Sequence, residues 1–108
     1  MKIDFNFMEQ KMTEHFKGGN GHLLTRIAEE GNNKFLILKF PAGSSIGLHT
    51  HQTNCEAVYV LKGSGTAVCN DVEEKLYEGV CHFCPKGEAH TIIADSQGLE
   101  LFAVIIEQ

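Results

Sequence analysis

The chain has 108 residues, of which 43% are hydrophobic, and this suits one domain with a core of its own. Its 14 acidic residues outnumber 9 basic ones, the net charge is −5, and no basic run marks a nucleic-acid-binding protein. No stretch has the apolar length of a signal peptide or a membrane-spanning helix. We therefore expect a soluble cytoplasmic protein of one domain, 1–108, with an N-terminal arm at 1–21 and a folded body at 22–108.

The N-terminal arm carries apolar residues at a spacing close to the helical period, at Phe5, Met8, Met12 and Phe16. A helix here would end at the glycine pair that follows Lys17. A loose arm with a short strand is the alternative. We expect His15, in this segment, to face solvent.

The rest of the chain consists of short β-rich runs separated by turn residues. The expected strands are 22–29, 34–40, 46–51, 56–61, 66–69, 74–77, 81–84, 89–94 and 99–106. Turns are expected between them, including residues 63–65 and 95–98. Regularly spaced short strands of this kind predict an all-β barrel or sandwich.

Two of the expected strands, 34–40 and 99–106, are apolar on both faces. A single-layered barrel wall needs only its inner face to be apolar, and a surplus of this size usually marks an interface. If Glu56 points inward on its strand, Tyr59 and Leu61 point outward. We therefore predict a homodimer with a two-fold axis, in which Tyr59 faces the partner.

A His-x-His pair, His49 and His51, suggests a metal site. Side chains two residues apart leave the same face of a strand, so both imidazoles can point toward one position. Glu56 follows after four residues, enough for a turn that brings it to the same position. Two imidazoles and a carboxylate suit a first-row transition metal. His90, which follows a Pro-x-Gly turn and opens an apolar run, is a fourth candidate.

These two stretches resemble the two sequence motifs of the cupin family. Residues 43–63 read glycine, five residues, His-x-His, four residues, Glu, six residues, glycine. Residues 79–90 read glycine, five residues, Pro-x-Gly, two residues, His. One departure is Ala94, because the second motif usually has Asn there, although that Asn is not a ligand in the family.

The resemblance covers about half of the chain, residues 43–94, and implies a single-domain, cupin-type β-barrel, which is a jelly-roll-like double-stranded β-helix. It also implies that one divalent transition metal ion is held by His49, His51, Glu56 and His90. Four protein ligands leave about two positions open on a six-coordinate Mn, Fe or Ni ion, whereas Zn would be closed or five-coordinate. The sequence does not choose among these metals.

Three functions remain open at this point. The first is a metal-dependent enzyme that acts on a small organic molecule, with the dioxygenases, decarboxylases and isomerases of the family as examples. The second is a non-catalytic module that binds a small ligand or the ion itself. A metal-free epimerase ranks last, because it would not need four ligand residues. No catalytic residue is assigned; the expected partner is a small molecule, not nucleic acid or a membrane.

Several other residues have a structural and a functional interpretation. Without a secretion signal we expect no disulfide framework among Cys55, Cys69, Cys81 and Cys84. The pair Cys81 and Cys84 would face opposite sides of a strand, and Cys55 or Cys84 is the candidate for a thiol that lines the pocket. For Arg26 a surface ion pair is favoured over a clamp for a substrate carboxylate. His82 is expected to be a satisfied or surface histidine.

Overall fold

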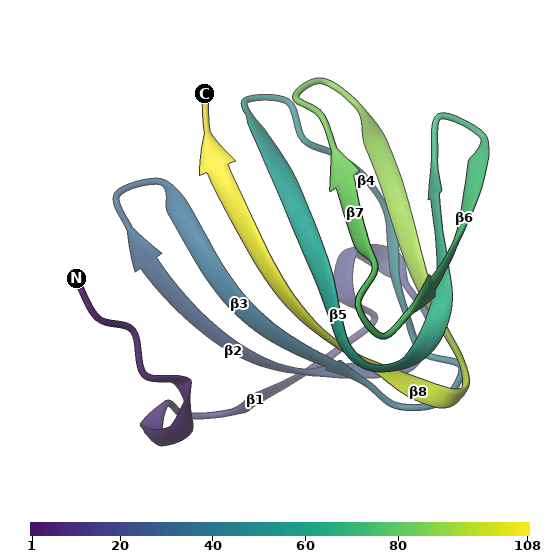
Figure 1. The fold of residues 1–108 in the computed structure, drawn as a ribbon, viewed down its shortest axis with the longest axis horizontal. Helices are drawn as coiled ribbons and strands as arrows, with labels where there is room; N and C mark the ends of the chain where they lie inside the picture. The colour runs from purple at the N-terminus through teal and green to yellow at the C-terminus, as the bar shows by residue number, and fades with distance from the viewer.

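The computed structural model describes residues 1–108 and consists almost entirely of antiparallel strands (Figure 1). Two short 3-10 turns lie near the N-terminus, η1 (Phe5–Phe7) and η2 (Phe16–Gly18). The strands are β1 (Lys11–Glu14), β2 (His22–Glu30), β3 (Asn33–Phe40), β4 (Ser45–Thr50), β5 (Asn54–Cys69), β6 (Val72–Tyr77), β7 (Cys81–Cys84) and β8 (Ala89–Glu107).

The sheet order is β1-β2-β3-β8-β5-β6, with β4 paired to β8 and β7 paired to β5. The two longest strands, β5 and β8, pair with each other in two successive segments. Residues 54–63 of β5 pair with residues 99–107 of β8, and residues 65–69 pair with 90–94. The strands therefore curve into the cup seen in Figure 1, and the predicted all-β, jelly-roll-like fold is confirmed.

Two predicted turns, 63–65 and 95–98, lie inside continuous strands instead. Gly63 and Gly98 both have positive φ, 85° and 77°, where the two strands bend together. A Cβ on Gly63 would overlap the carbonyl oxygen of Gly98, so the backbones meet in direct contact. These glycines allow β5 and β8 to bend against each other, and do not reverse the chain.

The predicted N-terminal helix is also wrong, and the short-strand alternative is correct. Strand β1 pairs with β2 in antiparallel register, with Met12 opposite Leu24. The apolar side chains of the arm pack in different places: Phe5 contacts Phe102 edge-on at 6.2 Å between ring centroids, and Phe16 packs against the core. These side chains do not pack against one common surface, so a helix that placed them all on one face would have nothing to bury that face against. His15 is exposed, as expected.

The inner faces of the strands form one hydrophobic core. Val58 and Val60 point into it, and Tyr59 and Leu61 point outward, as the alternation predicted. The largest fully buried apolar side chains include Phe40, Leu38 and Leu101; burying each contributes about 1.5–3 kcal/mol. The full cluster comprises Leu23, Leu36, Leu38, Phe40, Ile46, Val58, Val60, Ala67, Leu76, Ile92, Ala94, Leu99, Leu101 and Ala103.

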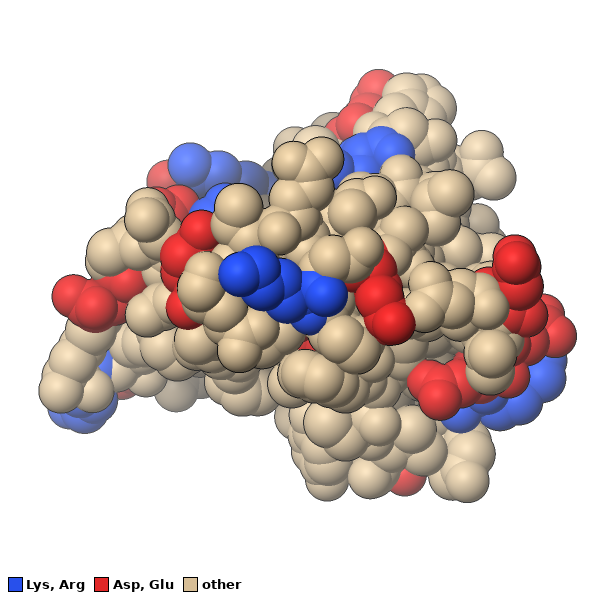
Figure 2. All heavy atoms as spheres, turned by 90° about the horizontal axis from the view of Figure 1, so that it is seen from above, with Lys and Arg blue, Asp and Glu red and all other residues tan.

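Charged side chains on the face seen in Figure 2 lie in separate acidic and basic groups among other residues. The basic groups form no continuous band on this face, in agreement with the mixed charge of the sequence. The structure contains no helix with the length and apolar character needed to cross a membrane.

Candidate metal centre

The structure brings together all four predicted ligand residues, from separate parts of the chain. His49 lies on β4 and His51 just after it, Glu56 is near the start of β5, and His90 is near the start of β8. His49 and His90 are direct partners in the β4–β8 register. His51, Glu56 and His90 are buried and His49 is partly exposed, so the group lies at the inner wall with one accessible side.

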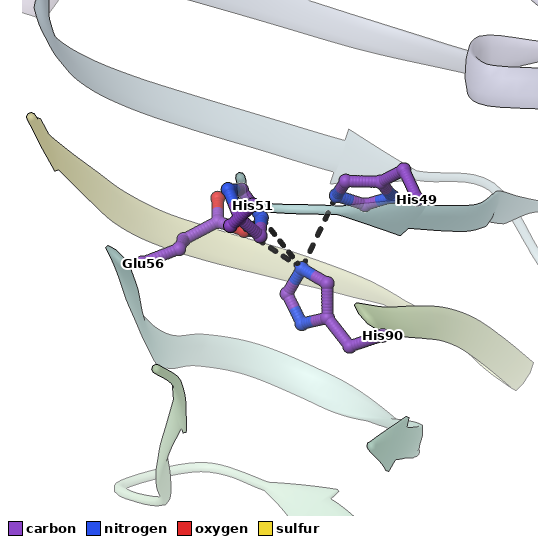
Figure 3. Close-up of side chains that lie close together, drawn as sticks. All are labelled: His49, His51, Glu56 and His90. Atoms are coloured by element: carbon purple, nitrogen blue, oxygen red, sulfur yellow. Dashed lines mark hydrogen bonds and ion pairs between the residues drawn. The ribbon is translucent and has the colours of Figure 1, made fainter. Parts of the chain in front are cut away.

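The spacing of the four donor atoms fits a single ion. His90 Nε2 lies 3.0 Å from His51 Nε2, 3.2 Å from His49 Nε2 and 3.0 Å from Glu56 Oε1 (Figure 3). His51 Nε2 lies 3.1 Å from Glu56 Oε1, and all four atoms lie within 4.8 Å of one another. With metal–ligand bonds of about 2.1 Å, ligands at right angles are about 3.0 Å apart and tetrahedral ligands about 3.4 Å apart. The residues can therefore hold one metal ion with only small movements of their side chains.

Each imidazole is oriented by a hydrogen bond on its other side. The Nδ1–H of His49 donates to the carbonyl of Gly47 at 2.8 Å, and that of His51 donates to Asn54 Oδ1 at 2.6 Å. His90 Nδ1 lies 2.9 Å from Nε2 of His82. With Nδ1 engaged, the lone pair on Nε2 is available to a metal.

Sequence reasoning missed these partners. Asn54 was treated as a turn residue, and His82 was expected to be satisfied or at the surface. His82 is a satisfied histidine, as expected, because it is 1% exposed and hydrogen-bonded to both His90 and Glu74; its link to a ligand histidine was not foreseen. Its position on the inward face of β7, alternating with exposed Phe83, was the signal that could have found it.

The ionisation states also suit a cation. Burial alone would raise the pKa of Glu56, but its hydrogen bonds from His51 and His90 outweigh this and lower the pKa to about 2. The bond to Glu56 raises the pKa of His51, and burial lowers the pKa of His49. One carboxylate anion and the imidazole nitrogens thus converge on one point, a donor set suited to a divalent transition metal.

A cavity of about 230 Å³ opens onto the ligand group, with His49, His51 and Glu56 in its wall. Its apolar wall comes mainly from β3, β4 and β8, and two lysines add positive charge. The other lining residues are Phe16, Lys17, Ile27, Asn32, Lys34, Leu36, Leu38, Ile46, Thr50, Asn54 and Ile105.

Two expectations for this region are corrected. Neither Cys55 nor Cys84 lines the cavity: the Cys55 thiol faces Ile106 O at 3.9 Å, and the Cys84 thiol is buried against Glu88 O at 3.5 Å. Cys81 and Cys84 do face opposite sides, one exposed and one buried, as predicted. Arg26 forms no surface ion pair; its Nε donates to the carbonyl of Met8 at 3.1 Å.

Comparison with known proteins decides the family. The family model described as a cupin domain matches residues 36–106. This chain belongs to the cupin family. The match includes every residue of the ligand group, and the cupin resemblance of the sequence is confirmed.

Among curated proteins, this cupin is similar to an oxalate-binding protein from Thermotoga maritima, with 35% identity over 99 residues, covering 85% of this chain and 82% of the relative. Among solved structures it is similar to a predicted oxalate decarboxylase from Thermotoga maritima, with a TM-score of 0.91, 28% identity and full coverage of both chains. A mutant of Bacillus subtilis oxalate decarboxylase shares the fold, with a TM-score of 0.81 and 21% identity, but this cupin covers only 29% of that chain.

Proposed function

We propose that this cupin binds one divalent transition metal ion through His49, His51, Glu56 and His90, and that the loaded site binds a small dicarboxylate of the oxalate class. The observation that carries the proposal is the convergence of four donor atoms, spaced as the ligands of one ion, beside a cavity of about 230 Å³ that three of the four residues line. The similarity to an oxalate-binding protein at 35% identity supports the ligand class.

The charge of the cavity favours an anionic ligand. A bound divalent ion would supply a positive centre that carboxylate oxygens can coordinate, and Glu56 offsets only one of its two charges. Lys17 and Lys34 in the cavity wall add two more positive charges. A six-coordinate ion with four protein ligands keeps about two positions open, which is the number that a bidentate dicarboxylate requires.

The apolar wall limits what else can enter. Leu36, Leu38 and Ile105 are among the residues that line the cavity, so a ligand with many polar groups would lose hydrogen bonds against them. A compact dianion can place its charged oxygens at the ion and the lysines. These residues hold and orient the ligand; they do not by themselves supply a reaction.

The direct test is metal content followed by ligand titration. Protein purified without an affinity tag should contain about one equivalent of Mn, Fe, Ni or Zn by elemental mass spectrometry, and a His49→Ala/His51→Ala double variant should contain none. Calorimetry should then detect oxalate binding to the loaded protein and not to the chelator-treated protein. Equal metal content in the two proteins would refute the site, and equal oxalate binding with and without metal would refute the ligand model.

Enzymatic turnover of the same ligand is the second candidate. The similarity to a predicted oxalate decarboxylase at 28% identity favours it. However, Glu56 is the one carboxylate among the lining residues and belongs to the ligand group, so the lysines are the remaining ionisable side chains of the cavity. Formate release from oxalate by the metal-loaded wild type, with loss of this release in Lys34→Ala, would support turnover. Oxalate binding without any product would support a non-catalytic binding protein.

We also propose that two copies pair through the outer face of strands β3, β8, β5 and β7. Ile37, Phe102 and Tyr59 lie side by side there in successive strand pairs, and Tyr59 is 44% exposed. A Tyr59→Asp variant should shift to monomer in sedimentation at micromolar concentration. Tyr77→Asp is the control, because Tyr77 is also exposed but lies on β6, outside this face. A Tyr59→Asp variant with the mass of the wild type would contradict the proposal.

A further inference from the structure

Two side chains outside the ligand group form a hydrogen-bonded chain behind His90. His82 Nε2 lies 2.9 Å from His90 Nδ1, the ring nitrogen that points away from the other ligands (Figure 3). On its other side, His82 Nδ1 lies 2.7 Å from Glu74 Oε1. The two imidazole rings are stacked at 5.2 Å between centroids with 19° between their planes.

The chain crosses from the interior to the surface. The side chain of His82 is 1% exposed, whereas that of Glu74 is 52% exposed. His82 lies on β7 and Glu74 on β6, the two strands that pair with opposite parts of β5. A buried histidine thus connects a ligand to a carboxylate in contact with water.

The direction of the hydrogen bonds follows from the chemistry of the groups. An ionised carboxylate only accepts, so Nδ1 of His82 must carry the hydrogen that it donates to Glu74. A neutral imidazole has one N–H, so Nε2 of His82 holds a lone pair and accepts from Nδ1–H of His90. With a metal ion bound, Nε2 of His90 then directs its lone pair at the ion; without the ion, that nitrogen lies 3.0 Å from the accepting carboxylate of Glu56.

The role of Glu74 becomes clear by comparison with His49. A backbone carbonyl fixes the tautomer of His49, because that oxygen cannot donate. A second histidine beside His90 could either donate or accept, and would leave the tautomer of His90 open. The carboxylate of Glu74 removes this freedom.

We propose that His82 and Glu74 are positioning residues of the metal centre, which fix the tautomer and ring orientation of His90 so that its Nε2 lone pair faces the ion. The inference rests on the proposed metal site for its purpose, but its structural content can be tested in metal-free protein. Hydrogen-bond partners of metal-bound histidines typically change metal affinity by about 10–100-fold.

The first measurement reads the tautomers of the metal-free protein by nitrogen-15 correlation spectra of the histidine rings at mildly alkaline pH. In the wild type, His82 should carry hydrogen on Nδ1 and none on Nε2, and Nδ1 of His90 should carry hydrogen. In Glu74→Ala, both rings should lose this single form. Glu73→Ala is the matched control, since Glu73 is exposed on the same strand and is not hydrogen-bonded to His82. A His90 with no hydrogen on Nδ1 in the wild type, or an unchanged Glu74→Ala spectrum, would overturn the proposal.

The second measurement is metal affinity by competition with a chelator, using Ni²⁺ as the probe. Glu74→Ala should weaken binding by about 10–100-fold, and Glu74→Gln, which keeps an accepting oxygen, should recover part of the loss. His82→Phe, which keeps the buried volume, should weaken binding as Glu74→Ala does. Glu74→Ala with the affinity of Glu73→Ala would overturn the proposal. Wild-type protein that binds no Ni²⁺ but shows the expected tautomers would refute the metal site alone.

Discussion

Metal binding should raise the melting temperature of this cupin, and loss of one ligand should remove most of the rise. With the free ion at 100 times its Kd, binding to the folded state adds about 2.7 kcal/mol of stability. Each kcal/mol shifts the Tm of a domain of this size by about 4–8 °C, so the expected rise is roughly 10–20 °C. The ligand group is preformed, with its four donor atoms within 4.8 Å of one another, so little of this gain is lost to ordering.

The perturbation is His51→Ala, which removes one of the four donor atoms. Even a partner that only orients a ligand changes affinity by about 10–100-fold, so loss of a ligand should weaken binding at least 100-fold. At the same metal concentration the added stability then falls to about 0.4 kcal/mol, a shift of only about 2–3 °C.

The assay is thermal unfolding followed by circular dichroism, with chelator-treated protein before and after addition of Mn²⁺, Ni²⁺ or Zn²⁺. His22→Ala is the control, because His22 lies on β2 outside the ligand group. The control should keep the full rise. A His51→Ala variant with the rise of the wild type would refute the assignment of the ligands.

Three further predictions concern the same architecture. The folded-state pKa of Glu56, about 2, lies below its ordinary value of 4.5, so metal-free protein should lose stability as the pH falls from 4.5 toward 2. Denaturant titrations of Glu56→Gln should show a smaller loss of stability over this range, and a loss equal to that of the wild type would count against the hydrogen bonds to Glu56. Gly47→Ala places a Cβ on the carbonyl oxygen of Lys17 and should cost about 1–3 kcal/mol in urea unfolding, whereas unchanged stability would mean that η2 moves freely from β4. Iodoacetamide should label exposed Cys81 and spare Cys84, whose pKa burial raises to about 12; peptide mass spectrometry that finds equal labelling would contradict this.

Most of the ligand group could be predicted from the sequence because three of its residues lie close together in the chain. His49 and His51 share a face through strand alternation, and Glu56 follows after a turn. His90 was placed by the resemblance of its stretch to a cupin motif, and the structure brings it beside the other three. The same alternation correctly placed Val58 inside and Tyr59 outside.

What the sequence could not give depends on contacts between distant segments. Gly63 and Gly98 look like turn residues when read alone, and only their contact with each other explains why the two strands continue through them. Likewise, Glu74 and His82 are eight residues apart on different strands, and nothing local indicates that one bonds the other. The helical spacing of Phe5 and Phe16 was misleading because each side chain packs against a different neighbour.

The pairing of β5 with β8 also sets the order in which the protein can assemble. Residues 99–107 lie between β3 and β5, so neither of these strands can complete its pairing until this late segment of the chain has been synthesised. His49 contacts His90 at a sequence separation of 41 residues, which is typical of slowly folding, non-local topologies. On a ribosome the first two histidines emerge long before their partner. Metal binding by this protein should therefore occur after the chain has folded, and should not direct the folding.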